Sequence, residues 1–203
     1  TFSSRRTIIS EIPTDRRGLV LPPINIDPPE HTEHRRLLLP FFTPKATAEW
    51  EPTIREICSR LLNGLDGQTE FDAAVEYAQE IPGDVTARML GVSLEDTPQF
   101  REWLHDLLEV GPTNPTVQRE TTTEMMDYLL QLTRERRAHH HDGDVVQYLL
   151  DQRMDGEALT DDAIAKTLFL LLIAGVDTTW SAISSSLLHL ATHPEDRQRI
   201  AHN

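Results

Sequence analysis

The feature that most constrains the fold is the stretch Asp161–Thr192, which predicts one long, mostly apolar helix. At 1.5 Å per residue such a helix is about 45 Å long. Thr160 before it is a suitable N-cap, and residues 193–195 (His-Pro-Glu) end it and start another helix. Its strongest apolar run, residues 168–176, is too short to span a bilayer, which needs about 20 apolar residues. We therefore expect a buried helix in a soluble core, with no membrane contact.

The rest of the chain also shows helical spacing of apolar residues, with Pro, Gly and Asp between the segments. Asp27 is expected to cap a first helix that begins with Pro28-Pro29-Glu30 and ends at Leu39. Strand signals are nearly absent, with residues 7–12 as the best candidate for an extended piece and residues 13–23 as a Pro-rich loop. The fold class is predicted to be all-α. The other predicted helices are residues 44 to about 64, 82–90, 98–110, 115–137 and 145–153.

Charge and cysteine content exclude several classes of protein. Nineteen Lys and Arg against 33 Asp and Glu give a formal net charge of −14, so nucleic acid is a poor candidate partner. The single cysteine, Cys58, excludes an internal disulfide framework and a Cys-rich metal site within this chain. A reducing, cytoplasmic location fits best. Because the chain lacks an initial Met and a leader, we expect it to be a piece of a longer protein.

The middle of the long helix contains an unusual polar cluster, residues 174–179 (Ala-Gly-Val-Asp-Thr-Thr). A glycine there costs about 1 kcal/mol relative to alanine. One interpretation places Asp177 and the threonines on a solvent-facing stripe. Apolar residues on both sides favour burial all round instead, and a buried Asp needs partners. Thr178 is expected to donate to the carbonyl of Ala174 and to open the helix locally, as often occurs at functional sites.

A second unusual segment lies on the first predicted helix. His31 and Arg35 are four residues apart, so they share one face and offer donors to an anionic group. The alternative is that both are ordinary solvated residues. The other histidines, including residues 139–141, are not spaced as metal ligands, and no metal site is expected within this chain.

Together, these two segments resemble those of the cytochrome P450 family of haem-thiolate monooxygenases, in its soluble bacterial form. Residues 27–32 followed by 35–37 are similar to the family's helix C, and residues 174–179 are similar to the oxygen-binding motif of its helix I. The resemblance covers essentially all 203 residues. It implies one incomplete haem domain, running from the end of helix B to the start of helix J. The N-terminal sheet and the C-terminal half with the cysteine ligand are missing.

The resemblance also implies roles for particular residues, with haem b as the cofactor. Asp177 and Thr178 would be the catalytic pair that delivers protons to dioxygen. The cofactor would be contacted by His31, Arg35, Ala174 and Gly175, and an apolar substrate pocket would be lined by Leu21, Ile24, Leu170 and Ile173. Cys58 lies among apolar residues at helical spacing, so it is expected to be a core residue. The axial cysteine is expected beyond Asn203.

The implied activity is insertion of one oxygen atom of dioxygen into a small apolar organic substrate, with electrons from NAD(P)H. The electron donor would be ferredoxin-type, received near Arg36 and Lys45, or a fused reductase. Residues 177–183 resemble the reductase-fused subgroup, which would add FMN and a 2Fe-2S cluster. Two alternatives stay open. A haem peroxygenase would not need Asp177 and Thr178, and a non-catalytic helical ligand-binding or interaction protein would need no haem.

Overall fold

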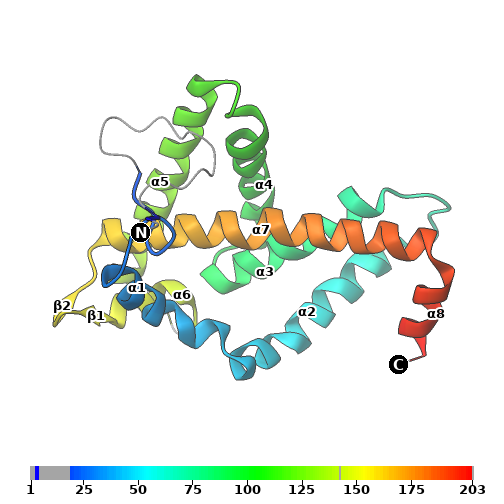
Figure 1. The fold of residues 1–203 in the computed structure, drawn as a ribbon, viewed down its shortest axis with the longest axis horizontal. Coiled ribbons are helices and arrows are strands. Elements are labelled where there is room, and N and C mark those ends of the chain that lie inside the picture. Colours follow the sequence, from blue (N-terminus) through cyan, green and yellow to red (C-terminus); the bar gives the residue numbers. More distant parts are fainter. Residues whose placement is uncertain (1–2, 5–18, 142, 203) are drawn as a thin grey trace.

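The long helix α7 (Asp161–Thr192) is the axis of the fold, and the other helices pack around it (Figure 1). The structure is a computed structural model that describes residues 3–4, 19–141 and 143–202. In Figure 1, α4 and α5 stand on one side of α7, α2 and α3 lie on the other, and α8 follows its C-terminal end. The helices around α7 are α1 (Glu30–Leu38), α2 (Pro44–Gly64), α3 (Glu80–Leu90), α4 (Thr97–His105), α5 (Pro115–Ala138), α6 (Val145–Asp151) and α8 (Pro194–Ala201).

Shorter elements join these helices. Two are 3-10 turns, η1 (Leu39–Phe42) and η3 (Leu94–Asp96), and two are wider π-helical turns, η2 (Ala73–Ala78) and η4 (Asp106–Val110). A two-stranded antiparallel hairpin, β1 (Arg153–Met154) and β2 (Glu157–Ala158), precedes α7. The predicted all-α class is therefore confirmed for the described residues.

Side-chain caps fix where several helices begin. Thr160 accepts a hydrogen bond from the backbone N–H of Ala163 at 3.2 Å, as the sequence predicts for α7. Thr43 does the same for α2, and Asp144 does so for α6. Asp144 also pairs with Arg136 of α5 at 3.2 Å, so the start of α6 is tied to the end of α5.

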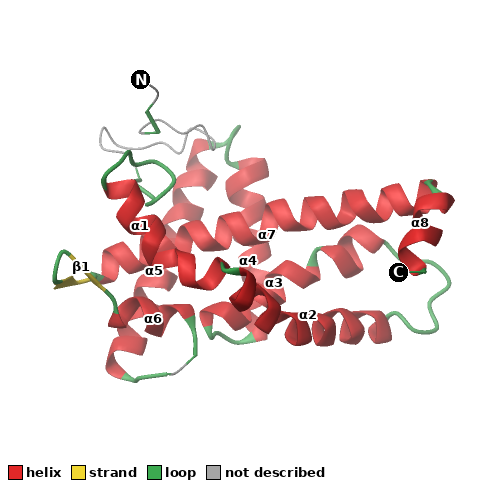
Figure 2. Cartoon of the chain, turned by 60° about the horizontal axis from the view of Figure 1, so that its bottom comes forward, coloured by secondary structure: helices red, strands yellow, loops and turns green. Residues whose placement is uncertain are grey.

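The hydrophobic core gathers around the N-terminal half of α7. All buried residues of α7 lie between Ile164 and Val176, and Phe169 and Leu172 are fully buried. They pack among α3, α5 and α6, where Leu90, Leu129 and Leu149 are also fully buried. Figure 2 shows the same arrangement from another side, with α1 and α6 near the N-terminal end of α7.

By length and composition alone, α7 is long and apolar enough to cross a membrane. In the structure it is instead the central core helix, with its apolar N-terminal half packed inside the protein. Burial in the core thus accounts for the hydropathy of this N-terminal half.

Several predicted boundaries are wrong, most clearly at the first helix. Asp27 is not its N-cap, because α1 begins at Glu30 and the Asp27 carboxylate accepts from the Ser3 hydroxyl and the Ser4 N–H. Competition from a partner far along the chain therefore overrides the local capping pattern. The helix predicted at 145–153 ends at Asp151, and the one predicted at 98–110 changes to a π turn after His105. The strand candidate at 7–12 and most of the 13–23 loop lie outside the described residues.

Candidate active site on the central helix

The polar cluster of α7 lies within an unbroken α-helix. The hydroxyl of Thr178 donates to the carbonyl of Ala174 at 2.8 Å, which confirms the predicted hydrogen bond. The predicted local opening of the helix is wrong, since α7 is continuous from Asp161 to Thr192. A hydroxyl that donates to Ala174 still has lone pairs with which to accept another hydrogen bond.

Side chains of the cluster point in two directions. Ala174 and Thr178, one turn apart, are exposed and share one face of the helix. Asp177 lies about 100° round the helix from Thr178 and is partly buried. The prediction of burial all round is therefore wrong for this part of α7. Thr179 is also exposed.

Gly175 has a packing role that the sequence does not reveal. A Cβ at this position would lie 3.3 Å from the hydroxyl oxygen of Thr86, a buried residue of α3. The missing side chain thus lets α7 approach α3 closely. The assignment of Gly175 and Ala174 to cofactor contact stays a prediction.

Asp177 lines a small cavity of about 100 Å³ between α7, α4, η4 and the junction of η2 with α3. Its wall combines polar and apolar residues: Gln79, Arg101, Leu104, His105, Glu109, Val176, Asp177 and Trp180. The indole N–H of Trp180 donates to the carbonyl of Ala74 in η2 at 3.1 Å, which fixes one side of the cavity. Among the described residues, Asp177 has no hydrogen-bond or ion-pair partner, although the sequence led us to expect one.

Sequence reasoning missed the side chains that face Asp177 from α4 and η4. His105 pairs with Glu109, with Nδ1 of the imidazole 3.2 Å from Oε2 of the carboxylate. The i,i+4 spacing of these two residues is the signal that could have identified the pair. Nothing in the sequence, however, indicates that this pair shares a cavity with a residue of the long helix.

The two residues of α1 that are predicted to contact haem have unused hydrogen-bond donors. His31 is partly buried and Arg35 is exposed, one turn apart on the same helix face. In the part of the chain that the structure describes, neither side chain has a hydrogen-bond or ion-pair partner. Two cationic or donor groups on one face fit an anionic group with two carboxylates.

The four predicted pocket residues belong to one hydrophobic region. Leu21, Leu170 and Ile173 are members of the buried core cluster, and Ile24 packs against it. In this chain they line none of the cavities described here. Their role as a substrate wall stays a prediction.

Cys58 is partly exposed, so its assignment as a core residue is wrong. Burial, together with the neighbouring Cys58 thiol, raises the pKa of Tyr77 to about 12. The cysteine thus lies at the contact between α2 and η2. The described residues hold no group of three His, Cys, Asp or Glu side chains that could bind a metal ion.

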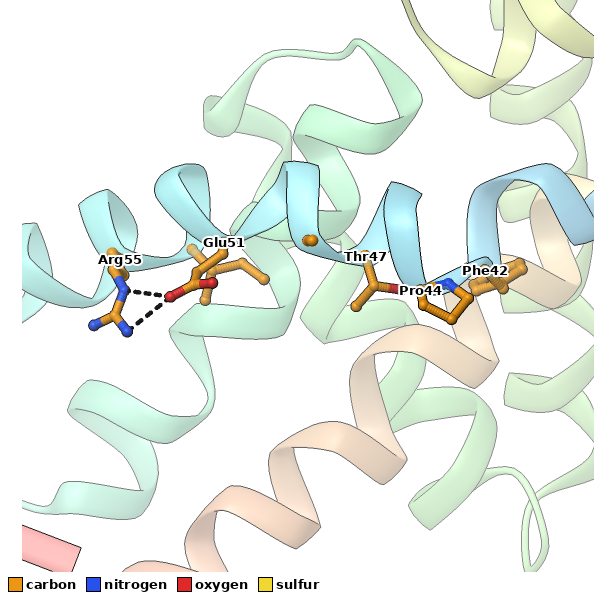
Figure 3. A pocket seen from close by; sticks show the side chains of 7 residues that line it. Phe42, Pro44, Thr47, Glu51 and Arg55 are labelled. Atoms are coloured by element: carbon orange, nitrogen blue, oxygen red, sulfur yellow. Dashed lines mark hydrogen bonds and ion pairs between the residues drawn. The ribbon is translucent and has the colours of Figure 1, made fainter. Parts of the chain in front are cut away.

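A second, larger depression of about 740 Å³ lies along the outer face of α2 and η1 (Figure 3). Its wall includes Phe42, Pro44 and Thr47, together with the ion pair in which Arg55 donates to Glu51 at 2.9 Å. None of the predicted site residues lines it. It contributes nothing to the site on α7.

Fold and site together define a helical protein built on one axial helix that carries an acid and an alcohol at its centre. The sequence model of the family described as cytochrome P450 matches residues 3–203, and the chain belongs to this family. It is 32% identical over 182 residues to cytochrome P450 CYP107DY1 of Priestia megaterium, covering 89% of this chain and 44% of that protein. It is 34% identical over 178 residues to the vitamin D(3) 25-hydroxylase of Pseudonocardia autotrophica, covering 88% and 44%.

Among solved structures, a mutant of P450 EryK in complex with erythromycin B is similar over the whole chain. The TM-score is 0.85 at 30% identity, covering 100% of this chain and 52% of that one. The chain therefore spans about half the length of the relatives that it matches.

Proposed function

We propose that this chain is part of a haem monooxygenase that oxidises a small apolar organic substrate. It would form the side of the active site at which dioxygen binds. The observation that carries the proposal is the acid–alcohol pair Asp177 and Thr178 at the centre of α7, in a chain that belongs to the cytochrome P450 family. Bound haem would supply activation of dioxygen and storage of electrons. The protein is then expected to be cytoplasmic.

His31 and Arg35 would hold the haem carboxylates. Both side chains are free of other partners among the described residues, and they stand on one face of α1. Charge-assisted hydrogen bonds of this kind contribute about 1.5–3 kcal/mol each. Replacing both residues with Leu in the complete protein should lower haem retention through purification. Unchanged haem occupancy and an unchanged rate of haem loss would contradict the assignment.

Asp177 and Thr178 would move protons between the two sides of α7. Asp177 takes protons on the cavity side, and its carboxylate can swing toward the face that carries Thr178. The Thr178 hydroxyl, anchored on Ala174 at 2.8 Å, then orders the group that receives the proton. Ala174 beside it has no bulk to block the approach of dioxygen and substrate.

The first test is the absorption spectrum of the complete protein, reduced and treated with carbon monoxide. A thiolate-type haem band is expected. Its absence would favour the helical ligand-binding or interaction protein instead. The axial cysteine is expected to follow Asn203 in the complete protein, and sequencing that region tests this point.

The second test is the coupling of product to reductant in Thr178→Ala. Haem binding and reductant consumption should be largely kept, while product yield falls and hydrogen peroxide is released, because proton delivery is no longer ordered. Asp177→Asn should instead slow turnover as a whole. Thr179→Ala is the control, about 100° further round the helix, and should be much milder. Equal coupling in Thr178→Ala and the parent would refute the role of the hydroxyl and would reopen the peroxygenase alternative.

Electron supply and substrate are proposed only as classes. A ferredoxin-type donor is the simpler arrangement, because nothing in the comparisons supports the FMN and 2Fe-2S cofactors of a fused reductase. Arg36 and Lys45 are both exposed, as a docking site for an acidic donor requires. The relatives above carry names or ligands as different as vitamin D(3) and erythromycin B, so the family membership does not select a substrate.

A further inference from the structure

The cavity beside Asp177 connects that residue with a solvent-exposed ion pair that the proposed function does not use. His105 and Glu109 both line the cavity, yet their side chains are 58% and 57% exposed. Asp177 lines the same cavity from α7 and is partly buried. One wall of the cavity thus reaches solvent, and another is formed by the proposed proton donor of the active site.

The interior of the cavity suits water. A volume of about 100 Å³ holds about three water molecules at roughly 30 Å³ each. The amide of Gln79, the guanidinium of Arg101 and the Asp177 carboxylate supply the polar partners that buried water needs. A short file of such water molecules conducts protons between groups that do not touch.

Arg101, which also lines the cavity, is already paired with another carboxylate. Its Nη1 donates to Oε2 of Glu80, in α3, at 2.7 Å, and the two side chains are only 22% and 30% exposed. Asp177 has no hydrogen-bond or ion-pair partner among the described residues. Its carboxylate is therefore available to exchange protons with the cavity.

We propose that His105 and Glu109 are the proton inlet of this site, passing protons from solvent through the cavity to Asp177. In one cycle the His105 imidazolium gives a proton to cavity water, and the water file gives one to the Asp177 carboxylate. The neutral imidazole then takes a proton from solvent, and no electrons move. Imidazole suits this task because it both accepts and donates a proton near neutral pH. The inference rests on the proposed function.

The charged groups that face this path come from each element packed around it. Arg101 and His105 belong to α4, Glu109 to η4, Glu80 to α3 and Asp177 to α7. Because Arg101 and Glu80 form their own ion pair, His105, Glu109 and Asp177 are the ionisable side chains left to carry protons along this path.

The decisive variant is His105→Gln in the complete enzyme, whose turnover is expected to fall about tenfold, less than the 10²–10⁴ of a direct acid because water partly replaces it. Its turnover is also expected to vary less with pH between about 5 and 8 than that of the parent, because the variant lacks the imidazole. Glu109→Asp should restore most of the turnover that Glu109→Gln loses. His189→Gln is the matched control, since His189 is 51% exposed and lies 3.0 Å from Asp196, away from the cavity.

A second measurement needs no turnover. In protein with ¹³C-labelled histidine, NMR reports on the imidazole of His105. Asp177→Asn should change the imidazole signals of His105, because both side chains line the same cavity, while those of His189 stay unchanged.

Equal turnover of the His105→Gln and His189→Gln enzymes at every pH would overturn the proposed proton inlet, as would His105 imidazole signals that Asp177→Asn leaves unchanged. Either result contradicts only the proton inlet when the protein still shows its haem absorption band. A missing haem band would instead refute the proposed function.

Discussion

Both halves of α7 carry apolar side chains, more densely in the first half, and the two halves differ in burial. Every buried residue of the helix lies between Ile164 and Val176, and residues 177–192 contain none. The first half is enclosed by α3, α5 and α6, whereas the C-terminal end meets α8 (Figure 1). An apolar sequence therefore indicates which helix surface must be buried, but it does not indicate which element buries it. Because the relatives are about twice as long, we expect the complete protein to cover the second half.

The largest effect is expected from shortening a side chain in the enclosed half of α7. Phe169 is fully buried, so Phe169→Ala should lower the free energy of unfolding by about 3–5 kcal/mol, through lost burial and the cavity that remains. Leu188 is 68% exposed, and Leu188→Ala in the same chain should change it by less than about 0.5 kcal/mol. Denaturant titration of the two variants measures the contrast. Similar losses would show that the two halves are equally packed.

The next effect concerns the uncovered half. Residues 1–203 expressed alone should self-associate, because Leu188 and Ile200 are 68% and 63% exposed on neighbouring helices. Sedimentation velocity should show Leu188→Lys reducing this association. In the complete protein, Leu188→Ala should instead cost about 2 kcal/mol or more, as for a covered leucine.

Residues 1–203 alone should also fail to give a thiolate-type carbon monoxide spectrum, since Cys58 lies at a helix contact away from α7. A stable monomer with that spectrum would contradict two expectations. One is that the second half of α7 must be buried by the rest of the protein, and the other is that a later cysteine is the haem ligand.

The smallest effect is at the junction of α7 and α8. A hydrogen bond from His189, with a second from Arg199, holds the pKa of Asp196 below its usual value. A carboxyl with a lowered folded-state pKa stabilises the fold above its unfolded-state pKa, and this contribution is lost as the pH falls through the lowered value. Asp196→Asn should therefore lower Tm by only about 1 °C near pH 6, and the difference should vanish at strongly acidic pH. A difference that grows on acidification would have the wrong sign.

Much of the fold was predictable because its signals are local. Thr160, a run of apolar spacing and the Pro194 break are enough to place α7, and the Thr178–Ala174 hydrogen bond follows from helix geometry. The capping role of Asp27 failed because its carboxylate binds Ser3 and Ser4, which are distant in sequence. The cavity beside Asp177 was not predictable for the same reason, since the residues of its wall meet only in the folded chain.

One contact of that wall determines how α7 is rotated about its own axis. The carbonyl of Ala74 accepts from the N–H of Gln79, at 3.0 Å, and from the indole of Trp180, at 3.1 Å. Trp180 therefore acts as an angular reference for the residues just before it. Inserting one residue between 174 and 180 would turn those residues by about 100° relative to the reference, whereas four residues would nearly complete a turn. The angular position of these residues around the helix axis therefore matters for this segment, as well as their identity.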